Sequence, residues 1–409
     1  MNIAARRDTF APDSNPVQLR SPELTALIAA IGEGASERDR TRTHPYAQID
    51  LIRASRLGAL RIPTTHGGSG ASLRDLLEVV IALGAADPNV AHALRNHFGF
   101  VERFVQPALD PQHGKWLGEV VAGKIFGLAA GETTSLPVGG NPLETRLVAE
   151  GAGYRLSGTK YYSTGTLYAD YVVVRAQDEG GRYASAILPV EREGITREDD
   201  WDGIGQRLTG TGTTHLDNVR VAGDEIVWDE SGSAYARPYN TTLPHLIVTA
   251  VEAGIIRAIW DDAIALVRRR SRSFAHAPAA SPIDDPFLQQ VIGQLEAAAF
   301  AAEATILAAA EKLDRATEAA VNGRIDEGLA HDAALAAAMA KIIVDEFAIR
   351  AGSQLFDVGG ASAAKRETNL DRHWRNARTL AAHNPASYKA QAIGAFSVKA
   401  TPLPRTGFF

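Results

Sequence analysis

Residues 371 to 385 read Asp371-Arg372-His373-Trp374-Arg375-Asn376-Ala377-Arg378-Thr379-Leu380-Ala381-Ala382-His383-Asn384-Pro385. The run holds one carboxylate, Asp371, and it stands at the beginning. The run ends in His-Asn-Pro, so the side chain there that can exchange a proton near neutral pH is His383. Acid–base chemistry at the end of this segment would therefore depend on a histidine and not on a carboxylate.

The helical pattern around this run extends from about Leu243 to Ile393. Its part from Leu288 to Ala320 is rich in alanine, with Leu295 and Ile306 among the small residues. Charged residues interrupt the alanines at helical spacing, which indicates packed helices and not a low-complexity segment. Small residues of this kind let helices pack closely, so the C-terminal part is predicted to be a helical bundle.

The middle of the chain, from about Ile125 to Val227, has a different pattern of residues. Short runs of β-branched and aromatic residues such as Tyr154 to Lys160 and Tyr171 to Arg175 are separated by Gly, Asp and Asn. This pattern predicts strands joined by tight turns, as in a small β-barrel or sandwich.

The N-terminal part, from about Pro22 to Gly123, is again helical in pattern. Ser21 followed by Pro22 is an N-cap signal, and the apolar spacing of Leu73 to Leu83 and Val90 to Val105 is near 3.6. The predicted organisation is an N-terminal helical domain (1–124), a middle β domain (125–235), a C-terminal helical bundle (236–395) and a C-terminal tail (396–409).

Composition narrows the class of protein. The chain has 409 residues, 45% of them hydrophobic, which is enough for two or three domains with a sizeable core. With 42 Lys and Arg against 48 Asp and Glu, the net charge is −6, so we expect neither nucleic acid nor an anionic membrane as a partner. The local exception is Arg268-Arg269-Arg270 with Arg272, which is either a solvated helix end or a phosphate site.

Several kinds of site are excluded or disfavoured. The absence of cysteine excludes disulfides and thiolate ligands, and the spacing of the 11 histidines predicts no metal site. Neither a Gly-x-Gly-x-x-Gly fingerprint nor a Walker-type loop is present. The polar N-terminus lacks the apolar core of a signal peptide, and no continuous apolar run reaches the roughly 18 residues of a membrane span. We therefore expect a soluble, cytoplasmic protein.

Three polar residues, His92, Asn96 and His97, stand near the start of one predicted helix among Ala91, Leu94 and Phe98. Residues 92 and 96 are four apart and share a face. Polar groups in such apolar surroundings indicate a lined cavity, although they would also suit the surface of a helix. A histidine in a cavity can donate to a bound group or shuttle a proton.

Five segments in order resemble the acyl-CoA dehydrogenase superfamily, and the resemblance runs from about Glu37 to Pro402. The segments are Leu57 to Gly70, Ala85 to His92, Gly158 to Gly165, Asp200 to Arg207 and Asp371 to Pro385. The resemblance implies an α+β fold of the acyl-CoA dehydrogenase type, with an N-terminal helical domain, a middle β-barrel domain and a C-terminal four-helix bundle.

Within the superfamily, the ending His383-Asn384-Pro385 is similar to the flavin-dependent monooxygenase branch, typified by dibenzothiophene monooxygenase. The dehydrogenases end this segment in Tyr-Glu-Gly-Thr, whose glutamate is the catalytic base. Their second site for that glutamate aligns near Pro244-His245, which also lacks a carboxylate, and Glu252 lies two turns away.

The resemblance therefore implies a two-component flavin-dependent monooxygenase, an oxidoreductase. A separate NAD(P)H:flavin reductase would supply reduced FMN. Oxygen would react at flavin C4a to form a hydroperoxide, which would oxygenate a small apolar substrate, most plausibly an organosulfur compound. The assembly implied is a homotetramer.

The resemblance also implies roles for single residues. His92 and His383 would be catalytic. Ser163, Thr164 and Trp201 would bind the flavin, and Arg272 would reach the flavin phosphate of a neighbouring subunit. Asn96, His97 and Leu128 would line the substrate pocket. Asn96, Leu128 and Leu380 depart from the sulfide monooxygenases, which carry tyrosine, asparagine and histidine there.

Other functions remain open at the level of sequence. One is an acyl-CoA dehydrogenase-like oxidoreductase with FAD in place of FMN. Another is a monooxygenase that acts on nitrogen or carbon. A third is a catalytically silent binding subunit, although retention of His92, Trp201 and His383 together disfavours it.

Overall fold

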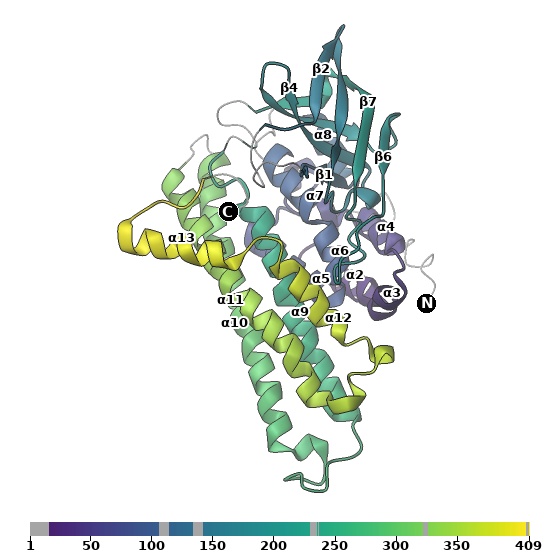
Figure 1. Ribbon diagram of the computed structural model, residues 1–409, viewed down its shortest axis with the longest axis vertical. Coiled ribbons are helices and arrows are strands. Elements are labelled where there is room, and N and C mark those ends of the chain that lie inside the picture. Colours follow the sequence, from purple (N-terminus) through teal and green to yellow (C-terminus); the bar gives the residue numbers. More distant parts are fainter. Residues whose placement is uncertain are drawn as a thin grey trace.

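The computed structural model describes residues 16–105, 114–133, 142–229, 235, 237–321, 326–405 and 409. Figure 1 shows a β-sheet at one end, a group of short helices beside and below it, and long helices that extend away from it. The N-terminal helices are α2 (Pro22–Gly32), α3 (Ala35–Thr41), α4 (Tyr46–Ser55), α5 (Leu73–Ala86), α6 (Pro88–Ala93), α7 (Arg95–Phe100) and α8 (Gly114–Val121).

Local signals start these helices where the sequence predicts. The Ser21 hydroxyl accepts a hydrogen bond from the N–H of Leu24, with proline at the first helical position of α2. The helix predicted over Val90 to Val105 is correct in type but interrupted. It consists of α6, α7 and a π-helical turn from Val101 to Val105, with a break at Leu94.

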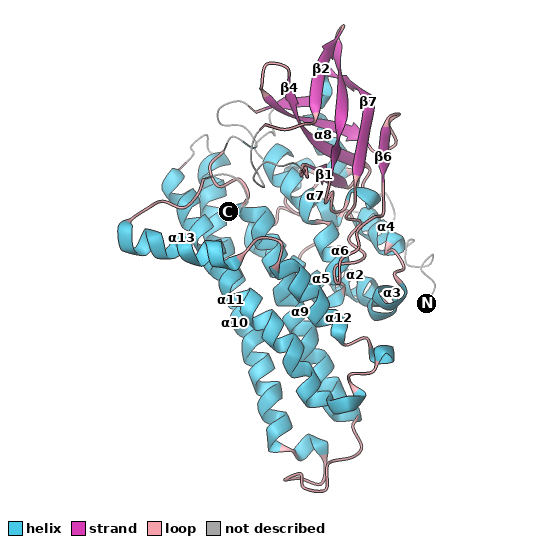
Figure 2. Ribbon diagram, viewed as in Figure 1, coloured by secondary structure: helices cyan, strands magenta, loops and turns pink. Residues whose placement is uncertain are grey.

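The middle of the chain forms one eight-stranded sheet, shown in magenta in Figure 2. Its strands are β1 (Phe126–Ala129), β2 (Arg146–Glu150), β3 (Gly153–Lys160), β4 (Tyr171–Asp178), β5 (Tyr183–Pro189), β6 (Ile195–Arg197), β7 (Thr214–Ala222) and β8 (Ile226–Trp228). The order is β6-β7-β3-β2-β4-β5-β8, and β1 runs parallel to β4 with Phe126 opposite Tyr171. The strands predicted in this part of the chain are present, β6 and β8 stand at the two ends of the strand order, and β1 pairs with β4 off this order.

The C-terminal part is helical, as predicted. It comprises α9 (Thr242–Arg269), α10 (Pro286–Val321), α11 (Glu327–Gly359), α12 (Asp371–Ala381) and α13 (Ala386–Lys399). Helices α5 and α9 cross closely because two glycines face the crossing. A Cβ on Gly254 would lie 2.3 Å from the carbonyl oxygen of Ile81, and a Cβ on Gly84 would lie 2.8 Å from that of Val251.

The domain boundaries remain predictions, although the elements change type close to them. The first helices end at Val121 and the strands span 126 to 228. Helix α13 continues to Lys399, beyond the predicted end of the bundle at residue 395.

Two helices, α9 and α10, are long and apolar enough to cross a membrane by length and composition. The sequence has no continuous apolar run of that length, and these helices pass because a mean hydropathy tolerates a few charged residues within the window. The apolar window of α9 is 89% buried, as expected of a core helix. That of α10 is only 28% buried, and Phe287 and Phe300 are 66% and 76% exposed. The tight packing predicted for Leu288 to Ala320 therefore applies to one face of α10 within the described chain.

Candidate active site

His92 is buried on α6 and is held by a residue from a distant loop. Its Nδ1 lies 3.0 Å from Oε1 of Gln206. An amide oxygen can only accept, so Nδ1 of His92 carries the proton and Nε2 is an acceptor. That Nε2 is buried and meets no polar partner among the described residues. Burial lowers the pKa of His92 to about 3, so the ring is neutral at pH 7.

His383 is oriented by an arginine from α7. Nη1 of Arg95 donates to Nε2 of His383 over 3.1 Å, and Nε of Arg95 donates to the carbonyl of Pro244 over 3.1 Å. Since a guanidinium has no acceptor, Nε2 of His383 accepts and its proton lies on Nδ1. Burial, reinforced by the charge of Arg95, holds the pKa of His383 well below its ordinary value. The two predicted catalytic histidines are thus both neutral but have opposite tautomers.

A third histidine, His245, stands beside His383. The ring centroids are 5.8 Å apart at an interplanar angle of 68°, and Nδ1 of His245 donates to the carbonyl of Phe409 over 3.0 Å. Burial keeps the pKa of His245 well below its usual value. His245 and His383 thus form a pair of adjacent neutral imidazoles, near the two places where the resemblance predicts the loss of a dehydrogenase glutamate.

Glu252, the nearest carboxylate along α9, does not substitute for that base. It is fully buried, and this burial raises the pKa of Glu252 well above its ordinary value. The charged groups that act on it are those of Lys341, Asp345 and Arg378. Burial favours the protonated form of this carboxyl group, which is a poor proton acceptor, so Glu252 belongs to the interior of the bundle.

The end of β3 is joined to the helices that carry His92 and Arg95. Asn96 donates from Nδ2 to the carbonyl of Thr164 over 2.7 Å, and the Thr164 hydroxyl lies 2.8 Å from that of Thr211. The turn needs glycine at Gly165, where φ is +80° and a Cβ would lie 2.3 Å from the carbonyl of Ala93. Ser163 is buried in the same turn, and its hydroxyl meets no partner among the described residues.

The loop that carries Gln206 is fixed from two sides by backbone hydrogen bonds. The N–H of Gln206 donates to Oδ1 of Asn376 on α12 over 2.6 Å, and the N–H of Leu208 donates to Oδ1 of Asn89 on α6 over 3.1 Å. Gln206 has a positive φ of 52°, a strained conformation that such contacts support. The segments 200–207 and 371–385, which the sequence singled out separately, are therefore in direct contact.

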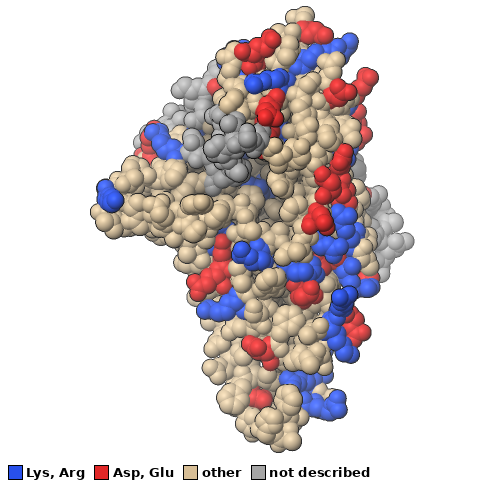
Figure 3. Space-filling model, viewed as in Figure 1, with Lys and Arg blue, Asp and Glu red and all other residues tan. Residues whose placement is uncertain are grey.

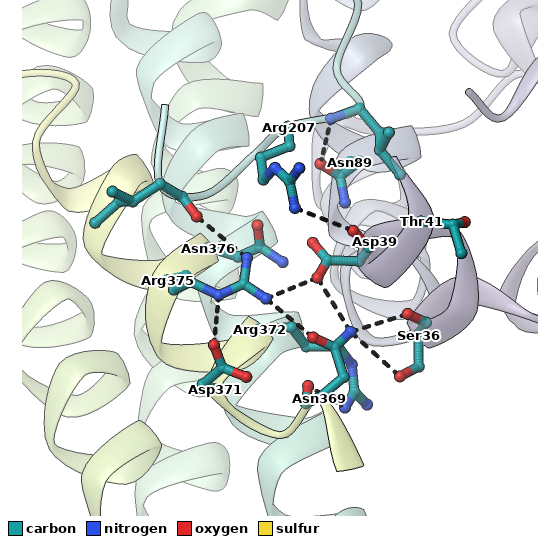
Figure 4. A network of polar contacts seen from close by, with 12 residues as sticks. Ser36, Asp39, Thr41, Asn89, Arg207, Asn369, Asp371, Arg372, Arg375 and Asn376 are labelled. Atoms are coloured by element: carbon teal, nitrogen blue, oxygen red, sulfur yellow. Dashed lines mark hydrogen bonds and ion pairs between the residues drawn. The ribbon is translucent and has the colours of Figure 1, made fainter. Parts of the chain in front are cut away.

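Asp39 on α3 extends this network, which Figure 4 shows from close by. Its Oδ2 accepts from Arg375 over 2.7 Å and from Asn369 over 3.1 Å, and its carbonyl accepts from Arg207 over 3.3 Å. Arg375 also donates to the carbonyl of Ile204 over 3.1 Å. Helices α3, α6 and α12 thus hold the loop in one position and so hold Gln206 against His92.

Trp201 stands at the start of the same loop. Its Nε1 donates to the carbonyl of Gly205 over 3.3 Å, and the edge of its ring faces Tyr162 at a centroid distance of 6.1 Å. It is half-buried and lines a small surface cavity together with Arg42 and Asp199. Tyr162 directly precedes Ser163, so Trp201 lies next to the turn predicted to face the flavin.

Two residues predicted to line the substrate pocket are placed differently. Nε2 of His97 donates to the carbonyl of Gly58 over 3.0 Å, and its Nδ1 accepts from the N–H of Phe126 over 3.2 Å. Both ring nitrogens of His97 thus bond to the backbone, burial lowers the pKa of His97 to about 4, and its role in a substrate pocket stays a prediction. Leu128 is half-buried in β1 and packs against an apolar cluster that includes Phe126.

Arg272 does not join the other predicted site residues within one chain. It is exposed in the segment that follows α9, whereas Pro244 and His245 lie at the start of that helix. The 28 residues of α9 span about 40 Å at 1.5 Å per residue. Any contact of Arg272 with a flavin beside His383 would therefore require a second copy of the chain.

The sequence interpretation missed Arg95, Gln206 and Asn376 as members of the site. Arg95 carried a detectable signal, because it is a charged residue between Leu94 and Asn96 and three positions after His92. Gln206 and Asn376 lie inside segments that the sequence analysis singled out. Their neighbours in the sequence give no sign that their side chains bond to residues more than 100 positions away. Among the described residues no group of three or more His, Asp or Glu could hold a metal ion.

The buried polar atoms around His92 suit a planar ligand with polar edges. Nε2 of His92, the Ser163 hydroxyl and Nε2 of Gln206 are buried and meet no partner among the described residues. Leaving three such atoms unsatisfied is costly in a folded protein, whereas a ligand with donors and acceptors would satisfy them. A flavin ring has both kinds of group, so the residues present fit that cofactor.

Comparison with known proteins gives a consistent picture. Residues 246–388 match the family model described as acyl-CoA dehydrogenase, C-terminal domain. The chain is 29% identical over 401 residues to a probable FMNH2-dependent monooxygenase, SfnC, from Pseudomonas putida, covering 95% of this chain and 97% of the relative.

Two solved structures are similar over nearly the whole chain. One is the FMN-bound dibenzothiophene monooxygenase TdsC from Paenibacillus sp. A11-2, with a TM-score of 0.86 and 27% identity over 94% of this chain and 98% of that one. The other is the methanesulfinate monooxygenase MsuC from Pseudomonas fluorescens, with a TM-score of 0.85 and 27% identity over 95% and 99%. Over nearly its whole length the chain is therefore similar to flavin-dependent monooxygenases, and its residues 246–388 carry the C-terminal domain of the acyl-CoA dehydrogenase family.

Proposed function

We propose that this protein is a cytoplasmic, two-component flavin-dependent monooxygenase that uses reduced FMN from a separate NAD(P)H:flavin reductase to oxygenate a small organosulfur compound. The observation that carries the proposal is the pair of neutral histidines, His383 and His245, at the two positions where a dehydrogenase would need a carboxylate. The FMN dependence of the relatives supports the choice of flavin.

When bound, the reduced flavin supplies the electrons that activate oxygen, through a hydroperoxide at C4a. The chain's own contribution is the placement of protons around it. The proton on Nδ1 of His383 makes this residue a hydrogen-bond donor, and Nε2 of His92 is an acceptor. One neutral donor and one neutral acceptor can both hydrogen-bond to a bound peroxide and so keep its proton in place.

Exclusion of water is the second contribution. His92 and Gln206 are buried, His383 is half-buried, and the loop 200–209 is held by contacts with α3, α6 and α12. A dry site favours transfer of oxygen to the substrate over loss of hydrogen peroxide. Exclusion of water and the lack of a carboxylate base therefore support an oxygenase more than an enzyme that removes an α-proton.

The proposal extends to a homotetramer in which Arg272 completes the flavin site of a neighbour. The support is the exposed apolar face of α10, with Phe287 and Phe300, and the distance of about 40 Å along α9 between Arg272 and the histidines of its own chain. A guanidinium offers two parallel donors, which suits a phosphate.

Two reactions of the purified protein test the reaction class. Reduced FMN and oxygen should give a transient flavin–oxygen adduct in stopped-flow absorbance, and an organosulfur substrate should shorten its lifetime. Acyl-CoA thioesters with an electron acceptor should give no turnover. Rapid acyl-CoA oxidation, with no adduct formed from FMN, would overturn the proposal in favour of a dehydrogenase.

A further inference from the structure

His44 connects the two segments that carry the predicted flavin contacts, 158–165 and 200–207. It is half-buried between α3 and α4. Its Nδ1 lies 2.7 Å from the hydroxyl oxygen of Tyr168, which follows the first segment, and its Nε2 lies 2.9 Å from Oδ2 of Asp199, which precedes the second. One imidazole from the N-terminal helices therefore bridges both segments, and the proposed oxygen chemistry does not use it.

The hydroxyl of Tyr168 has a second contact, with the far end of the loop that Asp199 begins. It donates to the carbonyl oxygen of Leu208 over 2.8 Å. Tyr168 is buried, and burial raises the pKa of its hydroxyl, so the phenol keeps its proton. A chain of three contacts thus runs from Asp199 through His44 and Tyr168 to Leu208, and it ties the two ends of the loop together.

These three contacts require three protons. The carboxylate of Asp199 and the carbonyl of Leu208 can only accept, and the phenol supplies one proton. A neutral imidazole supplies one more, so one of the three contacts lacks a proton, whereas an imidazolium supplies two. All three contacts are therefore hydrogen bonds only when His44 carries a positive charge.

Arg42 leaves the second oxygen of Asp199 to His44. Nη2 of Arg42 donates to Oδ1 of Asp199 and to the carbonyl of Trp201, each over 3.2 Å. A carboxylate that accepts from a guanidinium with one oxygen can accept from an imidazolium with the other. The charged side chains that line the surface cavity here are three carboxylates and two guanidiniums, from Arg42, Asp199, Asp200, Asp202 and Arg207. A positive charge on the adjacent His44 matches this excess of one negative charge.

Other charged groups near this chain of contacts have partners of their own. The pairs are Asp87 with Arg38 at 2.7 Å, Arg53 with Asp170 at 3.1 Å, Arg197 with Glu191 at 2.7 Å and Glu198 with His215 at 3.0 Å. The uncharged ring of Tyr46 on α4 packs edge-on against Tyr168 at a centroid distance of 5.2 Å. The contact that meets a charge on His44 is therefore the one with Asp199.

We propose that His44 is a positioning residue for this loop and that it secures both ends of the loop only while its ring is protonated. After loss of the Nδ1 proton, the Tyr168 hydroxyl can donate to His44 or to Leu208 but not to both. The loop, which holds Gln206 against His92, is then fixed less firmly. The part of the loop in oxygenation rests on the proposed function, whereas its attachment through His44 does not.

Hydrogen–deuterium exchange of the flavin-free protein tests this pH dependence. Peptides that cover residues 199–209 are followed at about pH 6 and about pH 8.5, where an ordinary imidazole is mostly charged and mostly neutral, with times scaled for the intrinsic exchange rate. We expect the protection of the loop to be roughly two- to tenfold lower at the higher pH, the scale of one hydrogen bond. A general weakening of the protein by acid would have the opposite sign.

Variants of the two linked side chains separate the charge from the packing. His44→Gln is polar but cannot take up a proton, so the loop should show the lower protection at both pH values. Tyr168→Phe removes the hydroxyl and with it the need for a third proton, so the pH dependence should be largely lost although His44 is present. His66→Gln, at an exposed histidine, is the matched control and should keep the wild-type dependence.

Equal protection of the wild-type loop at the two pH values would overturn the proposal. The wild-type pH dependence in His44→Gln would do the same, and Tyr168→Phe decides the question in that way if His44→Gln does not fold. Loop protection that falls with rising pH as expected, in a protein that gives no oxygenation with reduced FMN, would refute the proposed function and leave the role of His44 in place.

Discussion

Arg95 on α7 donates from Nη1 to Nε2 of His383 over 3.1 Å, although the two residues are 288 positions apart in the sequence. This single contact determines which nitrogen of His383 carries the proton, because an arginine can only donate. It also explains why His383 and His92, which are both neutral, present a donor and an acceptor respectively to a bound group.

Replacement of Arg95 tests this relationship. In Arg95→Met, Nε2 of His383 loses its donor, and the ring can adopt the other tautomer. We expect the amount of product formed per reduced flavin consumed to fall about ten- to hundredfold, with a matching rise in hydrogen peroxide. The measurement is the ratio of product to peroxide.

Arg95→Lys retains a donor and should recover part of the coupling, which a purely structural effect on packing would not produce. Arg40→Met, which removes one charge from the exposed surface of α3, is the charge control. A product-to-peroxide ratio in Arg95→Met equal to that of the wild type would show that the contact does not govern His383.

The side chain of His383 itself should matter more than its orientation. His383→Ala removes the proposed proton donor, and we expect product formation to fall by about a hundredfold, the usual scale for an acid–base group. Flavin affinity and the circular dichroism spectrum should remain those of the wild type. His276→Ala, at an exposed histidine, is the control, and unchanged oxygenation in His383→Ala would refute the assignment.

The buried histidines predict sensitivity to acid. Five of them have pKa values below the ordinary value in the folded protein, mainly through burial: His92, His97, His245, His373 and His383. Below about pH 6.5 the unfolded chain binds protons that the folded chain does not, so the stabilisation is complete above that pH and is lost as the pH falls towards the folded pKa values.

Between that pH and the folded pKa values, each of these histidines should lower the free energy of unfolding by about 1.4 kcal/mol for each unit by which the pH falls. Urea unfolding should therefore show a clearly lower free energy of unfolding at about pH 5.5 than at about pH 7, with several protons taken up on unfolding. His276→Gln should leave this dependence unchanged. Equal stability at the two pH values would contradict the buried, neutral state of the five rings.

The proposed assembly predicts a flavin site shared between subunits. Arg272→Ala should weaken FMN binding by roughly one to two powers of ten, because a charge-assisted phosphate contact is worth about 1.5–3 kcal/mol. Fluorescence titration of FMN measures this, and Arg269→Ala, at a nearby exposed arginine, is the control.

Sedimentation gives an independent readout of the same arrangement. Phe300→Glu places a charge on the exposed apolar face of α10 and should shift the protein to smaller species with weaker FMN binding. A wild-type monomer that binds FMN tightly would rule out the shared site.

The kinds and order of the elements could be predicted from the sequence because they depend on neighbouring residues. The Ser21–Pro22 cap, the apolar spacing of Leu73 to Leu83 and the β-branched run at Tyr171 all act within a few positions. The run ending at His383 resembles a motif of the superfamily, and this resemblance predicted how the elements are arranged. A motif can be found in the sequence because its residues follow one another along the chain. The sequence did not predict the break of this helix at Leu94. The apolar residues before and after the break keep the same helical spacing of about 3.6 residues.

The site depended on contacts that no local pattern contains. The sequence singled out His92 and His383 as candidate catalytic residues, and its resemblance to the superfamily predicted the loss of a carboxylate base. Only the tertiary structure joined Arg95 to His383 and Gln206 to His92, and so assigned their protons. It also showed that both ring nitrogens of His97 bond to the backbone, although the sequence around His97 gives no reason to distinguish it from His92. The physical reason is that burial, tautomer and pKa follow from what packs around a side chain, and those neighbours come from segments far away along the chain.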